Sequence, residues 1–121
     1  EILRCLVGSE MCIRDRDYPD MALPACDAVV SGQCSKALLF CGTGVGISMA
    51  ANKVKGIRCA HCADTLEAQL CRQHNNANMM AIGAGFTGPK LAAAMVETFL
   101  STAFEGGRHA RRVALMDAIE G

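Results

Sequence analysis

One short stretch of the chain combines a thiol, a hydroxyl and several glycines. Residues 41–46 have the sequence Cys-Gly-Thr-Gly-Val-Gly and follow an apolar run, residues 37–40, that is short enough for a buried strand. Residues 45–53 continue with apolar residues at helical spacing. A strand, a glycine turn and a helix start gather backbone N–H groups at the positive end of a helix dipole. Such a turn suits an anionic oxygen, either of a phosphate or of a developing enolate.

This glycine turn has two other interpretations. The dinucleotide fingerprint requires Gly-x-Gly-x-x-Gly, but here the third glycine is Gly46 and Ile47 occupies the required position, which disfavours nicotinamide or flavin binding. Cys41 could also be a small buried hydrophobe at a strand end, because free cysteine is among the most buried residue types. The spacing of the residues alone leaves this second interpretation open.

Three further side chains suit the chemistry of a phosphorylated substrate. His74 opens a polar loop over residues 74–78, and Arg108 and Arg112 are four residues apart in a predicted helix. On one helix face, two such guanidinium groups can bind a single phosphate. Considered alone, His74 is equally consistent with a solvated loop residue. Arg108 and Arg112 are likewise consistent with a charged, solvated helix face.

The eight cysteines of the chain raise the question of disulfides or zinc. Their irregular spacing and the lack of other secretory features favour reduced thiols. Cys59, His61 and Cys62, with Cys71 and His74 beyond, offer metal-ligand types, but a strand there would direct Cys59 and Cys62 to opposite faces. Zinc is therefore disfavoured.

Composition narrows the class of protein. The 121 residues fit one domain, 51% of them are hydrophobic and the net charge is +0. Disorder, nucleic-acid binding and a polybasic membrane patch are disfavoured. Residues 1–16 carry charges throughout and lack the apolar segment of a signal peptide, and no apolar run reaches membrane-spanning length. We expect a cytoplasmic protein with neither nucleic acid nor membrane as a partner.

The order of predicted elements indicates an α/β fold. Strands are expected over 37–40, 57–61 and 79–83, and helices over 20–31, 45–55, 88–100 and 108–119, with a further helix opening at Asp64. Alternating strands and helices imply a parallel sheet covered on both faces, whose ligands bind beyond the carboxyl ends of the strands. Cys41 and Thr43 fit that location. His74 precedes a strand, so topology alone does not bring it there.

Three separated motifs resemble a known family. Residues 41–53, Cys-Gly-Thr-Gly-Val-Gly-Ile-Ser-x-Ala-Ala-Asn-Lys, followed by Gly-Ile-Arg at 56–58, resemble the type B ribose-5-phosphate isomerases, a group that extends to isomerases of allose and galactose 6-phosphates. Arg-Gln-His-Asn-Asn-Ala-Asn at 72–78 and Phe-Glu-Gly-Gly-Arg-His-Ala-Arg-Arg-Val at 104–113 match in the same order, as does Asp-Tyr-Pro at 17–19. The resemblance covers residues 17–121, which we take as the isomerase domain.

The resemblance implies a Rossmann-like three-layer sandwich that assembles as a homodimer or tetramer and needs no cofactor and no metal. Its reaction would interconvert ribose 5-phosphate and ribulose 5-phosphate through an enediolate, a step of the pentose phosphate pathway. Cys41 would be the base that moves the proton, Thr43 would assist it within the turn, and His74 would be the acid/base that opens the sugar ring.

The resemblance also implies a set of substrate-binding residues. The turn would stabilise the enediolate, two residues would contact the sugar, and two arginines would hold the phosphate, on a terminal helix that in the family typically reaches a partner subunit's site. These substrate-binding residues are Gly42, Gly44, Val45 and Gly46 in the turn, Asn75 and Tyr18 at the sugar, and Arg108 and Arg112 at the phosphate.

Residues 1–16 do not look like this family, whose first strand ends in an Asp-His pair. Residues 5–16 instead resemble translated sequencing-adapter read-through, so we expect a foreign segment in place of the true N-terminus, the alternative being a native but divergent arm. The sheet would then lack the family's first strand or strands. A further family arginine after the third strand is Gly85 here. From these departures we expect the chain to be weakly active, inactive or poorly folded.

Two functions of other kinds stay open at this point. One is a subunit of a two-chain galactose-6-phosphate isomerase, which the presence of Cys41, His74 and both arginines disfavours as a catalytically silent chain. The other is a non-catalytic cysteine/histidine module that binds a metal or serves redox chemistry.

Overall fold

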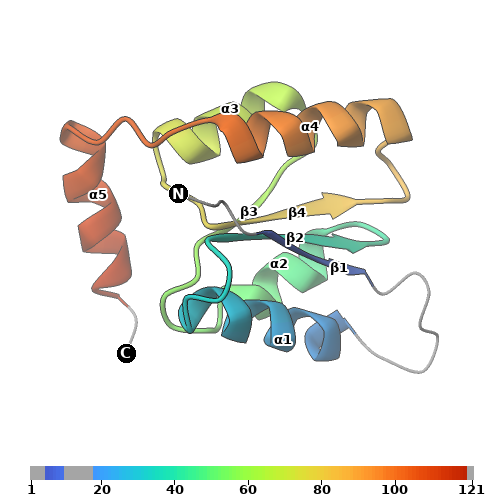
Figure 1. Cartoon of the computed structure of the whole chain (residues 1–121), viewed down its shortest axis with the longest axis horizontal. Coiled ribbons are helices and arrows are strands. Elements are labelled where there is room, and N and C mark those ends of the chain that lie inside the picture. The colour runs from blue at the N-terminus through green and yellow to red at the C-terminus, as the bar shows by residue number, and fades with distance from the viewer. Residues whose placement is uncertain (1–4, 10–17, 120–121) are drawn as a thin grey trace.

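The structure, a computed structural model, describes residues 5–9 and 18–119 (Figure 1). A parallel four-stranded sheet has the order β1-β2-β4-β3. The strands are β1 (Cys5–Ser9), β2 (Lys36–Cys41), β3 (Cys59–His61) and β4 (Met79–Gly83). The helices are α1 (Tyr18–Val30), α2 (Val45–Ala51), α3 (Thr65–Gln73), α4 (Pro89–Ser101) and α5 (Arg108–Asp117).

The sheet lies between two helical layers, as the alternation of elements predicts. Helices α1 and α2 cover one face and α3 and α4 cover the other (Figure 1). Neighbouring residues of β2 illustrate the alternation, because Leu39 packs in the core beneath α1 and α2 while Leu38 packs against α4 with Met95 and Phe99. The Rossmann-like three-layer sandwich is therefore confirmed. None of the helices in the described part of the chain is long and apolar enough to cross a membrane.

The two central strands fix where the glycine turn lies. Strands β2 and β4 pair from Ala37 opposite Met79 to Cys41 opposite Gly83. All five residues of β4 are buried, as expected for a central strand of a sheet that is covered on both faces. The turn that follows Cys41 thus leaves the sheet beside the carboxyl end of β4.

One part of the predicted fold is wrong. We expected no strand from residues 1–16, yet Cys5–Ser9 form β1, an edge strand paired with β2 from Cys5 opposite Lys36 to Ser9 opposite Phe40. The physical reason is that the outer edge of β2 presents unpaired N–H and C=O groups, and a short run containing Leu6 and Val7 has suitable β-propensity to pair with them. Pairing of this kind needs no family motif.

Two predicted boundaries are also corrected. Helix α2 ends at Ala51 rather than near residue 55, because the side chain of Asn52 exchanges two hydrogen bonds of 2.8 and 2.9 Å with the backbone of Cys59. Strand β3 begins at Cys59 rather than at residue 57, since the Arg58 N–H donates to the side chain of Asn78 instead of to a neighbouring strand. The other helices lie close to the predicted ranges.

Helix α5 lies apart from the sandwich, at the end of the sheet opposite the carboxyl ends of the strands (Figure 1). Gly106 and Gly107 precede it with φ angles of 71° and 56°, in the left-handed region that glycine enters most easily. The glycine pair therefore redirects the chain after α4 and allows α5 to run past the amino ends of the strands. We call this end of the sheet its amino edge, and the end where the strands finish its carboxyl edge.

Replacement of Gly83 by alanine should destabilise the fold. A Cβ at this position would lie 2.7 Å from the carbonyl carbon of Thr43, so the glycine turn would have to move away from β4. We expect Gly83→Ala to lower the free energy of unfolding by about 1–3 kcal/mol, the usual cost of overpacking. Urea denaturation measures it.

Gly88→Ala is the matched control, because a Cβ on Gly88 meets no atom within 4 Å and its φ of −69° suits any residue. Equal stability of the two variants would contradict the close packing of the turn against β4.

Candidate active site

The thiol of Cys41 lies at the last position of β2 and is only 4% exposed. The Gly44 N–H donates a hydrogen bond of 3.1 Å to its Sγ, and the Val45 N–H donates one of 3.2 Å to the Oγ1 of Thr43. Gly44 can point its N–H back at the sulfur because it adopts a left-handed φ of 80°. The turn therefore directs two N–H groups at the thiol and the hydroxyl that the sequence analysis selected.

Residues at the carboxyl ends of β3 and β4 hold the turn in place through contacts with its carbonyl groups. The backbone N–H groups of Ala84 and Gly85 donate to the carbonyls of Cys41 and Gly42 at 2.8 and 2.9 Å. On the other side, Nε2 of His61 lies 2.9 Å from the Thr43 carbonyl oxygen. Sequence analysis considered His61 only as a metal-ligand type, although its place at the end of a strand could have indicated that it meets the turn.

A small cavity of about 320 Å³ opens beside the turn at the carboxyl edge of the sheet. Its lining includes Thr43, His61 and Phe86 but not Cys41. Ligands of parallel α/β sheets bind at this edge. The cavity therefore places a concave surface where topology predicts a ligand.

His74 lies at the opposite edge of the sheet. It caps the carboxyl end of α3, and the loop after it runs beside the start of β2, where the Ala37 N–H donates to the Asn78 carbonyl. The four residue steps from Ala37 to Cys41 correspond to about 13 Å along the strand. Within one chain, the structure thus does not bring His74 and Cys41 together.

His74 instead stacks on His109, a residue that sequence analysis did not select. The two ring centroids are 4.3 Å apart and the ring planes differ by 15°. His109 is buried, and its Nε2 lies 3.7 Å from Oε1 of Glu105. Burial and the adjacent His74 hold the pKa of His109 below its ordinary value. The occurrence of His109 within the third family motif was the available signal.

The donor atoms of His74, Glu105 and His109 all lie within 4.8 Å of one another, so a metal site must be considered. An imidazole nitrogen binds a metal through a lone pair in the ring plane, and in two nearly parallel stacked rings those lone pairs do not converge. The described geometry therefore favours a stacked histidine pair over a metal centre.

The cysteines that offered a zinc alternative belong to no group of three donors in the part of the chain that the structure describes. The Cys62 thiol donates to the Sγ of Cys71 at 4.0 Å, and this bond together with burial raises the pKa of Cys62. Burial likewise raises the pKa of Cys59 to about 12. A raised pKa favours the neutral form of the Cys59 and Cys62 thiols, whereas a metal binds the thiolate.

The two arginines expected at the phosphate are exposed on α5, at the amino edge of the sheet. Neither Arg108 nor Arg112 has a hydrogen-bond or ion-pair partner within residues 5–9 and 18–119, so both guanidinium groups are available to a ligand. Of the two expected sugar contacts, Asn75 is exposed at the same edge. Tyr18 is the first residue of α1, and its side chain lies outside the described residues.

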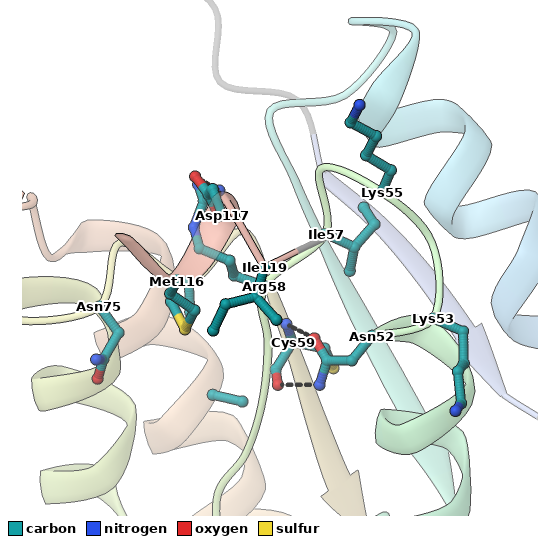
Figure 2. Close-up of a pocket in the computed structure, with 12 residues that line it drawn as sticks. Asn52, Lys53, Lys55, Ile57, Arg58, Cys59, Asn75, Met116, Asp117 and Ile119 are labelled. Carbon is teal, nitrogen blue, oxygen red and sulfur yellow. Dashed lines mark hydrogen bonds and ion pairs between the residues drawn. The ribbon is translucent and has the colours of Figure 1, made fainter. Parts of the chain in front are cut away.

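A larger cavity, of about 730 Å³, also lies at the amino edge (Figure 2). It is bordered by the segment 52–60 and the last turn of α5, and Asn75 is the one predicted site residue among those that line it. Several of its polar groups are already engaged, since Asn52 bonds Cys59 and Arg58 pairs with Asp117 at 3.3 Å.

Arg72 anchors the loops around the histidine pair, and its loss should be costly. The side chain is buried and donates to the carbonyls of Ala77 and Thr102 at 2.6 and 3.0 Å. Arg72→Met would leave both carbonyls unpaired, so we expect it to lower the free energy of unfolding by about 2–4 kcal/mol. Arg111→Met on exposed α5 should change it by less than about 0.5 kcal/mol. Thermal and urea unfolding of both variants measure this difference, and an equally small effect at Arg72 would contradict the anchoring role.

Comparison with known proteins places these features in context. A family model described as Ribose/Galactose Isomerase matches residues 5–116. Ribose-5-phosphate isomerase B of Escherichia coli K12 is 47% identical over 104 residues, which make up 86% of this chain and 70% of the relative.

Solved structures agree with that match. Ribose-5-phosphate isomerase B from Clostridium thermocellum superposes with a TM-score of 0.92 at 38% identity, covering 98% of this chain and 97% of that one. The Mycoplasma genitalium ribose-5-phosphate isomerase B with bound ribulose-5-phosphate gives a TM-score of 0.89 at 31% identity, covering 96% and 95%.

Proposed function

The chain belongs to the ribose/galactose isomerase family, which includes the type B ribose-5-phosphate isomerases, and on that premise we propose that it interconverts ribose 5-phosphate and ribulose 5-phosphate. The observation that carries the proposal is the hydrogen bond from the Gly44 N–H to the sulfur of Cys41. This N–H donor fixes the position of the sulfur within the turn, where the proposed base has to meet the substrate. The cavity beside Thr43 gives the substrate a place at the same edge.

In the proposed reaction the thiolate of Cys41 removes the proton from the carbon next to the aldehyde. The electrons of that C–H bond form the C=C bond of an enediolate, and the carbonyl oxygen gains the negative charge. The hydroxyl proton of the second carbon moves to the former aldehyde oxygen, so the negative charge passes to the oxygen of the second carbon. That oxygen then forms the ketone C=O while the C=C electrons take the proton back from the Cys41 thiol onto the former aldehyde carbon, which yields the ketose and regenerates the thiolate. The Thr43 hydroxyl and the N–H groups of the turn, including those of Gly44 and Val45, would stabilise the charged oxygens.

Ring opening and phosphate binding require residues from the other edge of the sheet. His74, Arg108 and Arg112 are separated from Cys41 in one chain, so we infer that a second copy supplies them and that each site is shared between two subunits. Helix α5 supports self-association as a homodimer or tetramer, because it lies apart from the sandwich and exposes Leu115, and the turn after it exposes Ile119. A charged sugar phosphate does not cross a membrane unaided, so we place the reaction in the cytoplasm.

We further propose that residues 1–16 are not the family's own first segment. The family match begins at residue 5 and β1 pairs with β2, yet the sequence from 5 to 16 contains no Asp-His pair. That pair helps the family hold the sugar and phosphate. The chain should therefore be slower than its relatives, although the residues proposed for proton transfer are present.

Removal of the proposed base should abolish turnover. We expect Cys41→Ala to lower kcat for ribose 5-phosphate by about 10²–10⁴-fold, the usual contribution of a positioned acid/base group. Cys34→Ala is the matched control, because this half-buried thiol lies outside the turn and should leave kcat unchanged. Equal activity of wild type and Cys41→Ala would contradict the assignment, and preference for a galactose or allose 6-phosphate would revise the substrate.

Mixing two inactive variants tests whether the site is shared. In a dimer of one Cys41→Ala chain and one His74→Ala chain, one site carries both defects and the other carries none. Random exchange of subunits should therefore restore about a quarter of wild-type activity. The mixture is unfolded, refolded together and assayed beside each variant alone. No recovery in a mixture that mass spectrometry shows to contain mixed dimers would contradict a shared site.

A further inference from the structure

His61 is the histidine that shares an edge of the sheet with Cys41. The chain has three histidines, and the other two, His74 and His109, stack together at the amino edge. His61 ends β3, which pairs with β4, and β4 pairs in turn with β2. The imidazole therefore lies at the carboxyl edge next to the glycine turn, in the lining of the 320 Å³ cavity.

The contact between His61 and the turn has a defined direction. Nε2 lies 2.9 Å from the Thr43 carbonyl oxygen, and a carbonyl oxygen only accepts, so Nε2 carries the hydrogen and donates. The ring also fills the space beside the turn, since a Cβ on Gly44 would lie 2.8 Å from Cδ2 of His61. The imidazole thus both bonds and packs against one peptide unit.

That peptide unit is the one that contacts the thiol. The Thr43 carbonyl and the Gly44 N–H belong to the same planar group, and the Gly44 N–H donates to Sγ of Cys41 at 3.1 Å. A donor on the carbonyl fixes the plane of the peptide and polarises its N–H, because linked hydrogen bonds strengthen one another. His61 is therefore connected to Cys41 through two hydrogen bonds and one peptide.

We propose that His61 is a positioning residue that holds the Thr43–Gly44 peptide so that its N–H faces the sulfur of Cys41. The role rests on the proposed isomerase function, in which this N–H contacts the sulfur of the base and stabilises the neighbouring enediolate. His61 itself does not exchange a proton with the substrate. Its contribution is the hydrogen on Nε2 and the packing of its ring.

Two substitutions distinguish the effect of the hydrogen bond from the effect of the imidazole ring. His61→Gln places an amide N–H near the position of Nε2, whereas His61→Leu retains apolar bulk and removes the donor. We expect His61→Leu to lower kcat about tenfold with little change in KM, which is less than the 10²–10³-fold cost of deleting an oxyanion-hole donor outright. His61→Gln should recover most of the lost kcat. Wild-type kcat in His61→Leu would overturn the proposal.

A direct catalytic role for His61 would give a different pattern. If the imidazole carried the proton itself, His61→Gln would be as inactive as His61→Leu, and that result would also overturn the proposal.

Hydrogen exchange of the Gly44 amide, followed by NMR, tests the same contact without turnover. Exchange should be about tenfold faster in His61→Leu than in wild type and near the wild-type rate in His61→Gln. If wild type itself failed to isomerise ribose 5-phosphate, the proposed function would fail, while this exchange pattern would still support the positioning of the peptide by His61. Unchanged exchange at Gly44 in His61→Leu would overturn that positioning.

Discussion

The hydrogen bond from the Gly44 N–H to the sulfur of Cys41 depends on most of the fold. The chemistry that we propose for the protein depends in turn on this bond. Gly44 must adopt a left-handed conformation, and neither it nor Gly83 has space for a Cβ. Both conditions follow from β2 and β4 lying side by side with Cys41 opposite Gly83. The two helical layers preserve that pairing by burying both faces of the central strands. The rigidity of one turn is thus a property of the whole sandwich.

The same sheet separates the proposed chemical groups. Parallel strands place the thiol at one edge, while α3 returns to the other edge and ends there at His74, beside α5 and its exposed arginines. Four residue steps from Ala37 to Cys41 separate the two edges by about 13 Å along the strand. If these groups act on one substrate, they must come from two chains, and α5, which lies outside the sandwich, is well placed to extend to a partner. In this account self-association is a requirement of catalysis.

Sequence reasoning predicted what depends on local pattern. The strand, turn and helix around Cys41, the alternation that gives a doubly covered sheet, and the position of His74 before a strand were all available from spacing. The contact of His61 with Thr43 was not, because it joins residues 18 positions apart through the pairing of β3 with β4. The pairing of β1 was missed for a related reason, since an edge strand needs backbone groups and β-propensity rather than a motif.

The central claim is that residues from both edges of the sheet bind one substrate, and NMR titration of the Cys41→Ala protein with ribose 5-phosphate tests it most directly. Without the base, the ligand persists unchanged while backbone amide shifts are recorded. The account predicts shifts in the turn at 42–46 together with shifts at His74, Arg108 and Arg112, all with the same saturation curve. Shifts confined to the 730 Å³ cavity, around Asn52, Arg58 and Met116, would contradict it.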